Sequence, residues 1–253
     1  MKSWADIGFE IEMTRDNSPT LRLLHSVDPE RDRGESMHHS AGACGETLLI
    51  YGNPARRTFE QVPKPSFMVV GLGLGYIEMT IAKEALLLGK SAQDIEKLTS
   101  FESLPELREF FYLWLWDRYD QLTSEVHEIY DEALSAVLAG CEISPGEIKK
   151  FLRVHFPNLE SIEGALECTE QVKHQYHAIM YDAYSSKTTP HLWDEEFLVR
   201  FFANTCAGVS LVSTYSGRME FKEALRKNNF EVVSREAFYG KRKSTIALRR
   251  MQL

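Results

Sequence analysis

Residues 66–75 read Ser-Phe-Met-Val-Val-Gly-Leu-Gly-Leu-Gly, an apolar run that ends in three alternating glycines. An unbroken apolar run is typical of a strand that is covered on both faces, as in a parallel sheet. Glycines after such a strand permit a tight turn into a helix, and they let backbone N–H groups approach a ligand closely. The stretch therefore predicts a buried strand, a turn that holds a nucleotide-like cofactor, and a helix over about residues 77–88.

Strand-like and helix-like segments alternate after this turn. Such alternation is typical of strand–helix–strand units in an open α/β sheet. The expected further strands are residues 98–102, 159–166, 177–184, 209–214, 230–234 and 244–248, and the expected helices are residues 105–119, 124–139, 197–203, 219–227 and one that begins at Pro145. The predicted fold class is therefore α/β, a Rossmann-like doubly wound sheet.

A different pattern precedes the linker Pro63-Lys64-Pro65. Residues 8–14 and 20–25 are strand candidates that are joined by a turn at Asn17-Ser18-Pro19. Residues 47–51 fit either a short strand or the start of a helix. These features predict a small β-rich extension at the N-terminus.

We accordingly expect two parts, an extension over residues 1–62 and the Rossmann-like domain over residues 63–253. The domain contains a helical insertion at about residues 105–158, which is rich in aromatic side chains at helical spacing. This spacing favours core packing over a base-stacking platform, because the aromatic side chains cover most of a helix surface and must be buried.

Charge and composition narrow the function classes. The chain has 253 residues and a formal net charge of −8, which argues against broad electrostatic affinity for nucleic acid. Its last fifteen residues nevertheless contain Lys241, Arg242, Lys243, Arg249 and Arg250 and no acidic residue, which indicates a local basic patch. No apolar run reaches the roughly 18 residues of a membrane helix, and the N-terminus lacks a secretory signal. We therefore expect a cytoplasmic protein with no membrane partner.

Metal-binding patterns are missing from the sequence. The cysteines form no Cys-x-x-Cys pair, and the histidines form no His-Glu-x-x-His motif. Cysteines without such spacing are usually small buried apolar residues. We therefore predict no structural or catalytic metal; the cysteines are Cys44, Cys141, Cys168 and Cys206.

Glu102 closes the second expected strand, about 27 residues after Gly75. An acidic residue at this position can accept hydrogen bonds from both ribose hydroxyls of an adenosine cofactor. The alternative is a solvated residue beside a helix N-cap. Tyr76 stands where the dinucleotide fingerprint has its third glycine, so a dehydrogenase is disfavoured.

Asp182 stands at the carboxyl end of the expected strand 177–184, where open α/β sheets place their ligands. A carboxylate at this position would stabilise a bound sulfonium, and it could orient an attacking amine. The alternative is a carboxylate that caps the next segment of the chain.

Three ordered blocks resemble the MnmC-like methyltransferases, which are tRNA 5-methylaminomethyl-2-thiouridine methyltransferases of bacteria. Residues 182–193 read Asp-Ala-Tyr-Ser-Ser-Lys-Thr-Thr-Pro-His-Leu-Trp, in which Asp182, Pro190 and Trp193 match the family signature. Residues 34–47 and 238–243 resemble the family's Glu-x-Tyr-His-Ser block and its closing basic block. Together with the glycine turn, the blocks span nearly the whole chain.

The resemblance implies a methyltransferase that uses S-adenosyl-L-methionine (SAM) and N-methylates the aminomethyl group of a wobble uridine in tRNA. Asp182 would position the amine and help its proton leave, and Tyr184 would offer an aromatic face to the base. Cofactor contacts are implied for Gly71, Gly73, Gly75, Glu102, Glu46 and Asp182. Contacts to tRNA phosphates are implied for Lys187, Lys241, Arg242 and Lys243. The alternatives are a structural carboxylate at Glu46 and a solvated face for the basic residues.

The sequence departs from the family pattern at several positions. Met37 replaces a tyrosine, His39 a serine and Ser186 a proline; Thr189 replaces an asparagine, and Ala165 an aspartate beside the adenine. The oxidase domain of bifunctional members is absent, so we expect no flavin and a separate oxidase as an upstream partner. Two alternatives stay open: a SAM-dependent methyltransferase that acts on a small molecule or a protein, and a non-catalytic binding protein that retains the fold.

Overall fold

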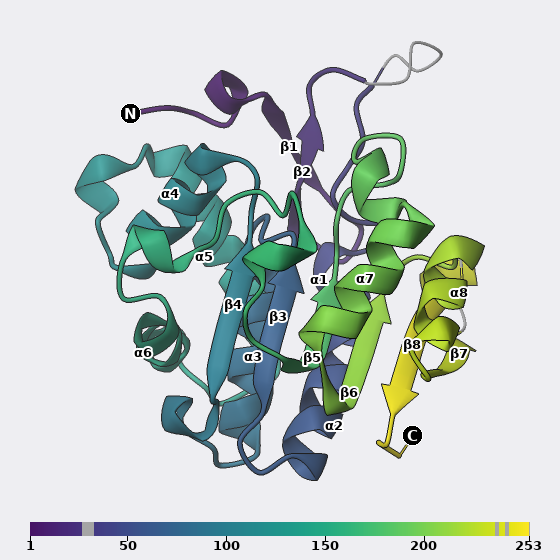
Figure 1. Ribbon diagram of the computed structural model, residues 1–253. Coiled ribbons are helices and arrows are strands. Elements are labelled where there is room, and N and C mark those ends of the chain that lie inside the picture. Colours follow the sequence, from purple (N-terminus) through teal and green to yellow (C-terminus); the bar gives the residue numbers. More distant parts are fainter. Residues whose placement is uncertain (27–32, 236–237, 241–242, 253) are drawn as a thin grey trace.

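A computed structural model of the protein describes residues 1–26, 33–235, 238–240 and 243–252. Its centre is a six-stranded sheet with the order β4-β3-β5-β6-β8-β7 (Figure 1). The strands are β3 (Ser66–Val70), β4 (Lys97–Phe101), β5 (Tyr176–Tyr181), β6 (Cys206–Thr214), β7 (Glu231–Arg235) and β8 (Ser244–Arg249). Strands β4, β3, β5 and β6 pair in parallel, and β8 is antiparallel to both of its neighbours. The sheet confirms the predicted Rossmann-like α/β fold.

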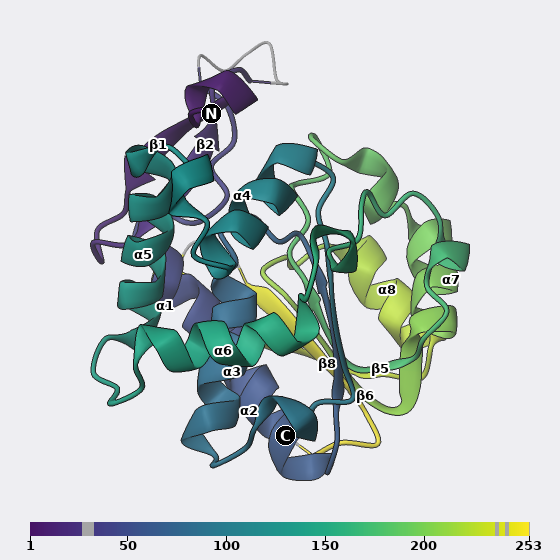
Figure 2. The same cartoon turned by 90° about the vertical axis from the view of Figure 1, so that its left-hand side faces the viewer.

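The apolar run of β3 faces both helical layers. Phe67 and Val69 pack in one cluster with residues of α3 (Tyr76–Leu87), whereas Met68 and Val70 pack in another with residues of α7 (Glu195–Thr205) and α8 (Met219–Lys227). Successive side chains of a strand point to opposite faces, so an unbroken apolar run requires a cover on each face. Figure 2 shows these covers, with α2 (Asn53–Gln61), α3 and α6 (Pro145–His155) on one side and α7 and α8 on the other.

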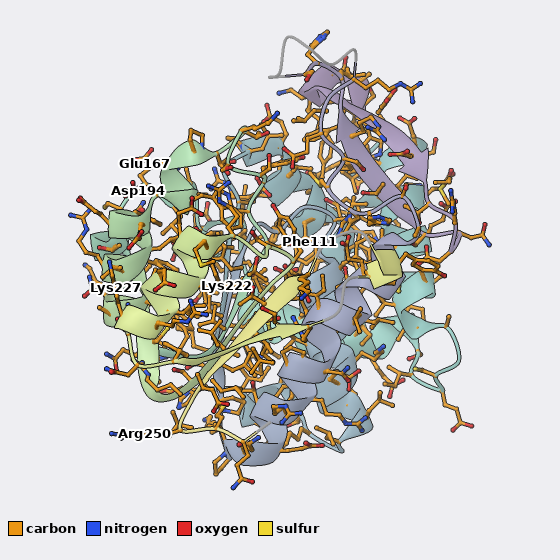
Figure 3. The ribbon with its side chains drawn as sticks, turned by 90° about the vertical axis from the view of Figure 1, so that its right-hand side faces the viewer. Phe111, Glu167, Asp194, Lys222, Lys227 and Arg250 are labelled. Atoms are coloured by element: carbon orange, nitrogen blue, oxygen red, sulfur yellow. The ribbon has the colours of Figure 1, made fainter. Side chains whose placement is uncertain are left out.

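The outer surface of the α7–α8 layer is polar. Asp194 caps α7 by accepting a hydrogen bond from the backbone N–H of Phe197 at 2.9 Å. Lys227 of α8 pairs with Glu195 of α7 at 2.6 Å, which links the exposed sides of the two helices (Figure 3). The two predicted helices, residues 197–203 and 219–227, are both present in this layer, each with an apolar side against the sheet.

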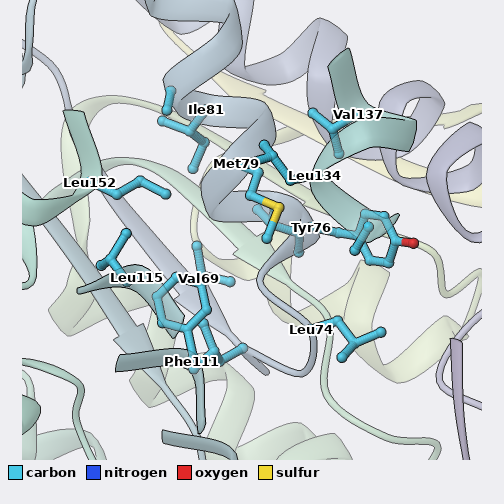
Figure 4. Packing of buried hydrophobic residues seen from close by; sticks show 14 of the residues in the cluster. Val69, Leu74, Tyr76, Met79, Ile81, Phe111, Leu115, Leu134, Val137 and Leu152 are labelled. Atoms are coloured by element: carbon cyan, nitrogen blue, oxygen red, sulfur yellow. The ribbon is translucent and has the colours of Figure 1, made fainter. Parts of the chain in front are cut away.

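The aromatic insertion forms α4 (Pro105–Leu115), α5 (Ser124–Leu138) and α6. Phe111 and Trp114 are fully buried, and Trp114 stacks on Tyr130 of α5 with ring centroids 5.3 Å apart. Phe111 points toward α3 and packs near Val69 and Leu115 (Figure 4). The structure confirms core packing for Phe110, Phe111 and Trp114, whereas Tyr119, at the end of the aromatic stretch, is exposed.

The strand predicted over residues 159–166 is wrong. The segment begins with a single 3-10 turn, Leu159–Ser161, and makes one isolated parallel bridge, between Glu163 and Phe101. Its backbone pairing consists of the Glu163 N–H to Ser100 O and the Glu102 N–H to Glu163 O, at 2.9 and 3.0 Å. The segment lies outside the edge strand β4, where charged residues and Gly164 interrupt the apolar pattern that a further strand would need.

The N-terminal hairpin consists of β1 (Phe9–Met13) and β2 (Pro19–Leu23) and forms a sheet of its own beyond the carboxyl ends of the main strands (Figure 1). Tyr76 attaches this hairpin to the glycine turn, because its hydroxyl donates to Pro19 O at 2.8 Å. The bulky residue at the third-glycine position is thus an anchor for the N-terminal extension.

The rest of the extension is helical. Residues 47–51 belong to a helix start, the second of the two predicted structures: α1 (Ala43–Thr47) continues into the π-helical turn η2 (Leu48–Gly52) and then into α2. These helices contact α3 and the sheet. The boundary predicted at residue 62 stays a prediction.

Candidate cofactor and acceptor site

A cavity of about 610 Å³ opens at the carboxyl ends of the parallel strands. Its lining includes Val70 and Phe101, which end β3 and β4, and Asp182, which follows β5. Open α/β sheets bind ligands where the strand order reverses direction. The order β4-β3-β5 has this reversal at β3, so the cavity lies at the switch point, and its volume is typical of a cofactor site.

The glycine turn enters the cavity through Gly71, Leu72, Gly73 and Leu74. Gly71, Gly73 and Gly75 all have positive φ angles, of +99°, +51° and +73°, a conformation that favours glycine. A Cβ on Gly71 would lie 2.5 Å from the backbone oxygen of Asp182. This glycine is therefore needed for the close approach of β3 and β5 at the cavity floor.

Gly73 and Gly75 have different surroundings. A Cβ on Gly73 would lie 3.1 Å from the Met37 sulfur, so Met37 covers this part of the turn. A Cβ on Gly75 would lie 2.3 Å from a ring carbon of Phe111. Gly75 does not contribute to the cavity lining, and its geometry is explained by packing against α4. Its predicted role at the cofactor stays a prediction.

Glu102 lines the cavity and holds the glycine turn in place. Its carboxylate accepts hydrogen bonds from the backbone N–H of Gly73 at 3.1 Å and of Leu104 at 3.0 Å. Burial raises the pKa of Glu102, and the backbone donors oppose this rise. Leu104 is the N-cap residue of α4, so Glu102 does lie beside a helix N-cap. The Ser103 hydroxyl is a third and more distant donor, 3.4 Å from Oε1. A carboxylate has about four acceptor positions, so a ribose diol can bind if it displaces this long contact.

Asp182 and Glu46 bring two further carboxyl groups to the cavity. Asp182 Oδ1 accepts a hydrogen bond from the Tyr51 hydroxyl at 2.6 Å. Burial raises the pKa of Asp182 to about 7, the Tyr51 hydrogen bond lowers it, and the charge of Glu46 raises it. Glu46 accepts from the backbone N–H of His39 at 2.7 Å, and burial raises its pKa as well.

Tyr184 lines the cavity with a hydroxyl that has no hydrogen-bond partner in the described part of the chain, although it is buried. Burial raises the pKa of Tyr184 well above its ordinary value. The backbone oxygen of Tyr184 accepts from Trp193 Nε1 at 2.6 Å, which fixes the loop that carries the ring. A buried polar atom without a partner normally finds one in water or a ligand, so Tyr184 supports a polar occupant of the cavity.

Glu35 was not singled out from the sequence, although it also lines the cavity. Its carboxylate accepts from the Ser185 backbone N–H at 3.1 Å, from Ser185 Oγ at 2.9 Å and from Thr188 Oγ1 at 2.6 Å. These bonds join residues 34–39 to the loop after β5. The partners are about 150 residues apart in the chain, so no local spacing could have indicated the contact.

One of the four predicted phosphate contacts, Lys187, lines the cavity. Lys187 is exposed and contributes to the lining, whereas Lys243 is exposed and lies outside it. Lys241 and Arg242 lie outside the described residues. Arg218, which was not predicted, lines the cavity, and its Nη1 donates to Ser186 Oγ at 2.6 Å.

The remaining expectations concern Ala165, metal binding, the cysteines and membrane-spanning helices. Ala165 does not line the cavity, whereas its neighbour Leu166 does. Within the described ranges, no group of three His, Cys, Asp or Glu side chains could hold a metal ion. Cys44 and Cys206 are buried as expected, but Cys168 is exposed because it lies in the irregular segment before β5. None of the described helices has both the length and the apolar character to cross a membrane.

The cavity fits SAM. A space of cofactor size is lined by two positive-φ glycines, Gly71 and Gly73, by the strand-end carboxylate of Glu102, and by the buried hydroxyl of Tyr184, which has no partner among the described residues. Gly71, Gly73, Glu102 and Glu46 could hold the donor. Asp182, predicted both to bind the cofactor and to take part in catalysis, lies beside the glycine turn in the same cavity.

Glu102→Ala is expected to weaken SAM binding by roughly ten- to hundredfold, because hydrogen bonds to the ribose hydroxyls contribute about 1–1.5 kcal/mol each. Isothermal titration calorimetry with SAM measures the change. The control is Glu109→Ala, which removes an exposed carboxylate from the neighbouring helix α4 and should leave the affinity unchanged. An unchanged affinity of Glu102→Ala would remove the ribose assignment.

Known proteins resemble this chain in sequence and in fold. A model of the S-adenosyl-L-methionine-dependent methyltransferase family matches residues 121–250, about half of the chain. The structure of MnmC2 from Aquifex aeolicus is similar with a TM-score of 0.65 and 23% identity, over 97% of this chain and 72% of that one. A ribosomal protein L11 methylase from Lactobacillus delbrueckii subsp. bulgaricus aligns at a TM-score of 0.41 and 11% identity, over 89% and 90% of the two chains. No curated protein sequence matches the chain.

The family match decides the class of the protein. It confirms the predicted resemblance, and it supports an enzyme over a non-catalytic binding protein. The strand-end cavity and the glycine turn are where such a fold would bind its methyl donor. The chain belongs to the family of S-adenosyl-L-methionine-dependent methyltransferases, and SAM is its cofactor.

Proposed function

We propose that the protein transfers the methyl group of SAM to an aliphatic amine on a wobble uridine of tRNA. The observation that carries this proposal is the Asp182 carboxyl group at the floor of the cavity, next to the glycine turn. Glu35, Glu46 and Glu102 also line the cavity, so its interior is acidic. An acidic interior favours a cationic donor and a basic amine, and it disfavours an anionic acceptor group.

Asp182 is the residue that we assign to the acceptor. Its Oδ1 is engaged by Tyr51, so Oδ2 is the oxygen that would accept a hydrogen bond from the amine. SAM, when bound, supplies an electrophilic methyl group. Asp182 would hold the neutral amine with its lone pair directed at that group, and it would take the proton that the amine loses on methylation. With its pKa near 7, Asp182 can accept and release a proton at neutral pH.

The tRNA acceptor is supported by the mouth of the cavity. Lys187 and Arg218 are exposed cations that line it, and the backbone oxygen of Lys243 lies against Gly217, the neighbour of Arg218. Aromatic rings of Tyr184, Trp193 and Tyr215 contribute to the lining and could pack against a base. The three sequence blocks shared with the MnmC-like family support the same acceptor.

A small molecule or a protein is the second candidate acceptor. The net charge of −8 favours it, because tRNA binding requires the few cations at the mouth to overcome an acidic molecule. Binding of tRNA should weaken steeply with added salt, whereas binding of a small neutral acceptor should not.

The decisive experiment is mass spectrometry of wobble uridines in cells that lack the gene. We expect aminomethyl uridine to accumulate and methylaminomethyl uridine to disappear, and the purified protein with SAM should restore the methyl group on tRNA from those cells. A normal level of methylaminomethyl uridine in the tRNA of these cells would contradict the proposed tRNA acceptor. In this proposal the reaction takes place in the cytoplasm, and a separate oxidase acting upstream supplies the free amine.

A further inference from the structure

Tyr51 of η2 places a buried hydroxyl on Asp182. The side chain is 2% exposed, and its hydroxyl lies 2.6 Å from Asp182 Oδ1 and 3.3 Å from the backbone oxygen of Tyr181. Burial and the nearby Asp182 raise the pKa of Tyr51 well above its ordinary value. Tyr51 therefore stays protonated at every physiological pH, and its hydroxyl donates a hydrogen bond to the Asp182 carboxylate.

The backbone around Tyr51 is held from the opposite side. The carbonyl of Ile50 accepts from Ser213 Oγ at 2.6 Å and from Arg235 Nη1 at 3.2 Å. Both donors come from the sheet, Ser213 from β6 and Arg235 from β7. The hydroxyl thus reaches Asp182 from a fixed support, and a fixed donor orients a carboxylate more precisely than a mobile one.

The charged and titratable groups around Asp182 otherwise oppose its ionisation. Glu46 from α1 raises the pKa of Asp182 directly. Glu78 from α3, Glu102 after β4, and Glu35 and Tyr184 at the adjoining loops are acidic groups as well, and Asp182 itself raises the pKa of Glu78 and of Tyr184. Tyr215 interacts with Tyr51, and Arg235 is the cation behind Tyr51. The Tyr51 hydroxyl, by contrast, donates a hydrogen bond to Asp182 and so favours the charged form of the carboxyl group.

We propose that Tyr51 is a positioning residue that keeps Asp182 ionised and turns its free oxygen toward the acceptor. The proposal rests on the function proposed above for Asp182. Tyr51 lies outside the three sequence blocks that resemble the MnmC-like family. The proposal gives η2 a role in the reaction.

Tyr51→Phe should move the acidic limb of the rate profile to higher pH. Asp182 has a raised pKa, so the ionised form that accepts a proton is lost as the pH falls through about 7. Removing the donor raises that midpoint further, since a hydrogen bond to a charged group is lost. We expect kcat for tRNA at pH 7 to fall roughly tenfold and to recover toward the wild-type value near pH 9.

Tyr181→Phe is the matched control. Tyr181 is also buried, adjoins Asp182 in the chain, and donates its hydroxyl to a backbone oxygen, that of Leu192. The Tyr181→Phe variant should lose a similar free energy of unfolding, and the acidic limb of its rate profile should stay at the wild-type pH. A loss in Tyr51→Phe that is the same at all pH values would reduce Tyr51 to a packing residue and overturn the proposal.

A readout without an acceptor separates this proposal from the tRNA assignment. In protein labelled with ¹³C at the aspartate carboxyls, the Asp182 signal is identified by its loss in Asp182→Asn, and its titration midpoint should be higher in Tyr51→Phe than in wild type. An unchanged midpoint would overturn the role of Tyr51, whereas inactivity of the wild type on tRNA would overturn only the proposed acceptor. If Tyr51→Phe fails to fold, 3,5-difluorotyrosine at position 51 retains the ring and strengthens the donor, and it must lower the midpoint.

Discussion

Asp182→Asn should reduce kcat/KM for methyl transfer by at least about a hundredfold, since a positioned proton acceptor contributes roughly 10²- to 10⁴-fold. The amide has the shape of the carboxyl group, and its oxygen can still accept the Tyr51 hydroxyl, so the fold should survive. What the amide cannot do is accept a proton from the amine. Transfer of labelled methyl groups to tRNA, together with circular dichroism of the variant, measures both effects.

The pH dependence sharpens this test. Wild-type activity should fall below pH 7, because Asp182 becomes protonated there, whereas the residual activity of Asp182→Asn should lack this limb. Asp194→Asn is the control, since Asp194 is an exposed cap of α7 on the outer surface (Figure 3) and its loss should leave kcat unchanged. An unfolded Asp182→Asn variant would show that Asp182 is structural, and a folded variant as active as wild type would contradict its proposed role as proton acceptor.

The fold was predictable where one physical pattern dominates. The run at residues 66–70 needed cover on both faces, and helices lie on both faces. The strand predicted over residues 159–166 was wrong because two glutamates and Gly164 interrupt its apolar residues, and such a segment can lie beside a strand without entering the sheet. The segment makes a single bridge to the edge strand β4. Whether it pairs further depends on its neighbours in space, which a local sequence pattern does not contain.

From the pattern of the residues alone, the candidate site was predictable where it follows strand ends, whereas Glu46 was named only through the family resemblance. Glu102 and Asp182 could be placed at the cavity because the carboxyl ends of parallel strands meet at one edge of a sheet. Tyr51 and Glu35 reach the same cavity from the N-terminal part, through partners more than a hundred residues away. Gly75 shows that spacing alone does not place a glycine at the cavity: it lies outside the lining, a side chain there would meet the ring of Phe111, and its role at the cofactor stays a prediction.

Gly71→Ala is expected to be the most damaging substitution in the glycine turn. Its φ of +99° is costly for alanine, and the new methyl group would lie 2.5 Å from the Asp182 backbone oxygen, so β3 and β5 would have to separate at the cavity floor. We expect the free energy of unfolding to fall by roughly 3–5 kcal/mol and SAM affinity to fall by at least about a hundredfold. Urea denaturation and calorimetric titration with SAM measure the two losses.

Gly89→Ala separates the two causes. Gly89 also has a positive φ, of +69°, but a Cβ there would meet nothing within 4 Å. It should therefore lose only the backbone term of about 1–2 kcal/mol, with no change in SAM affinity. The difference between the two variants is then the cost of the clash with Asp182. If both variants were equally destabilised and both bound SAM normally, the close approach of Gly71 to Asp182 would have no part in shaping the cofactor site.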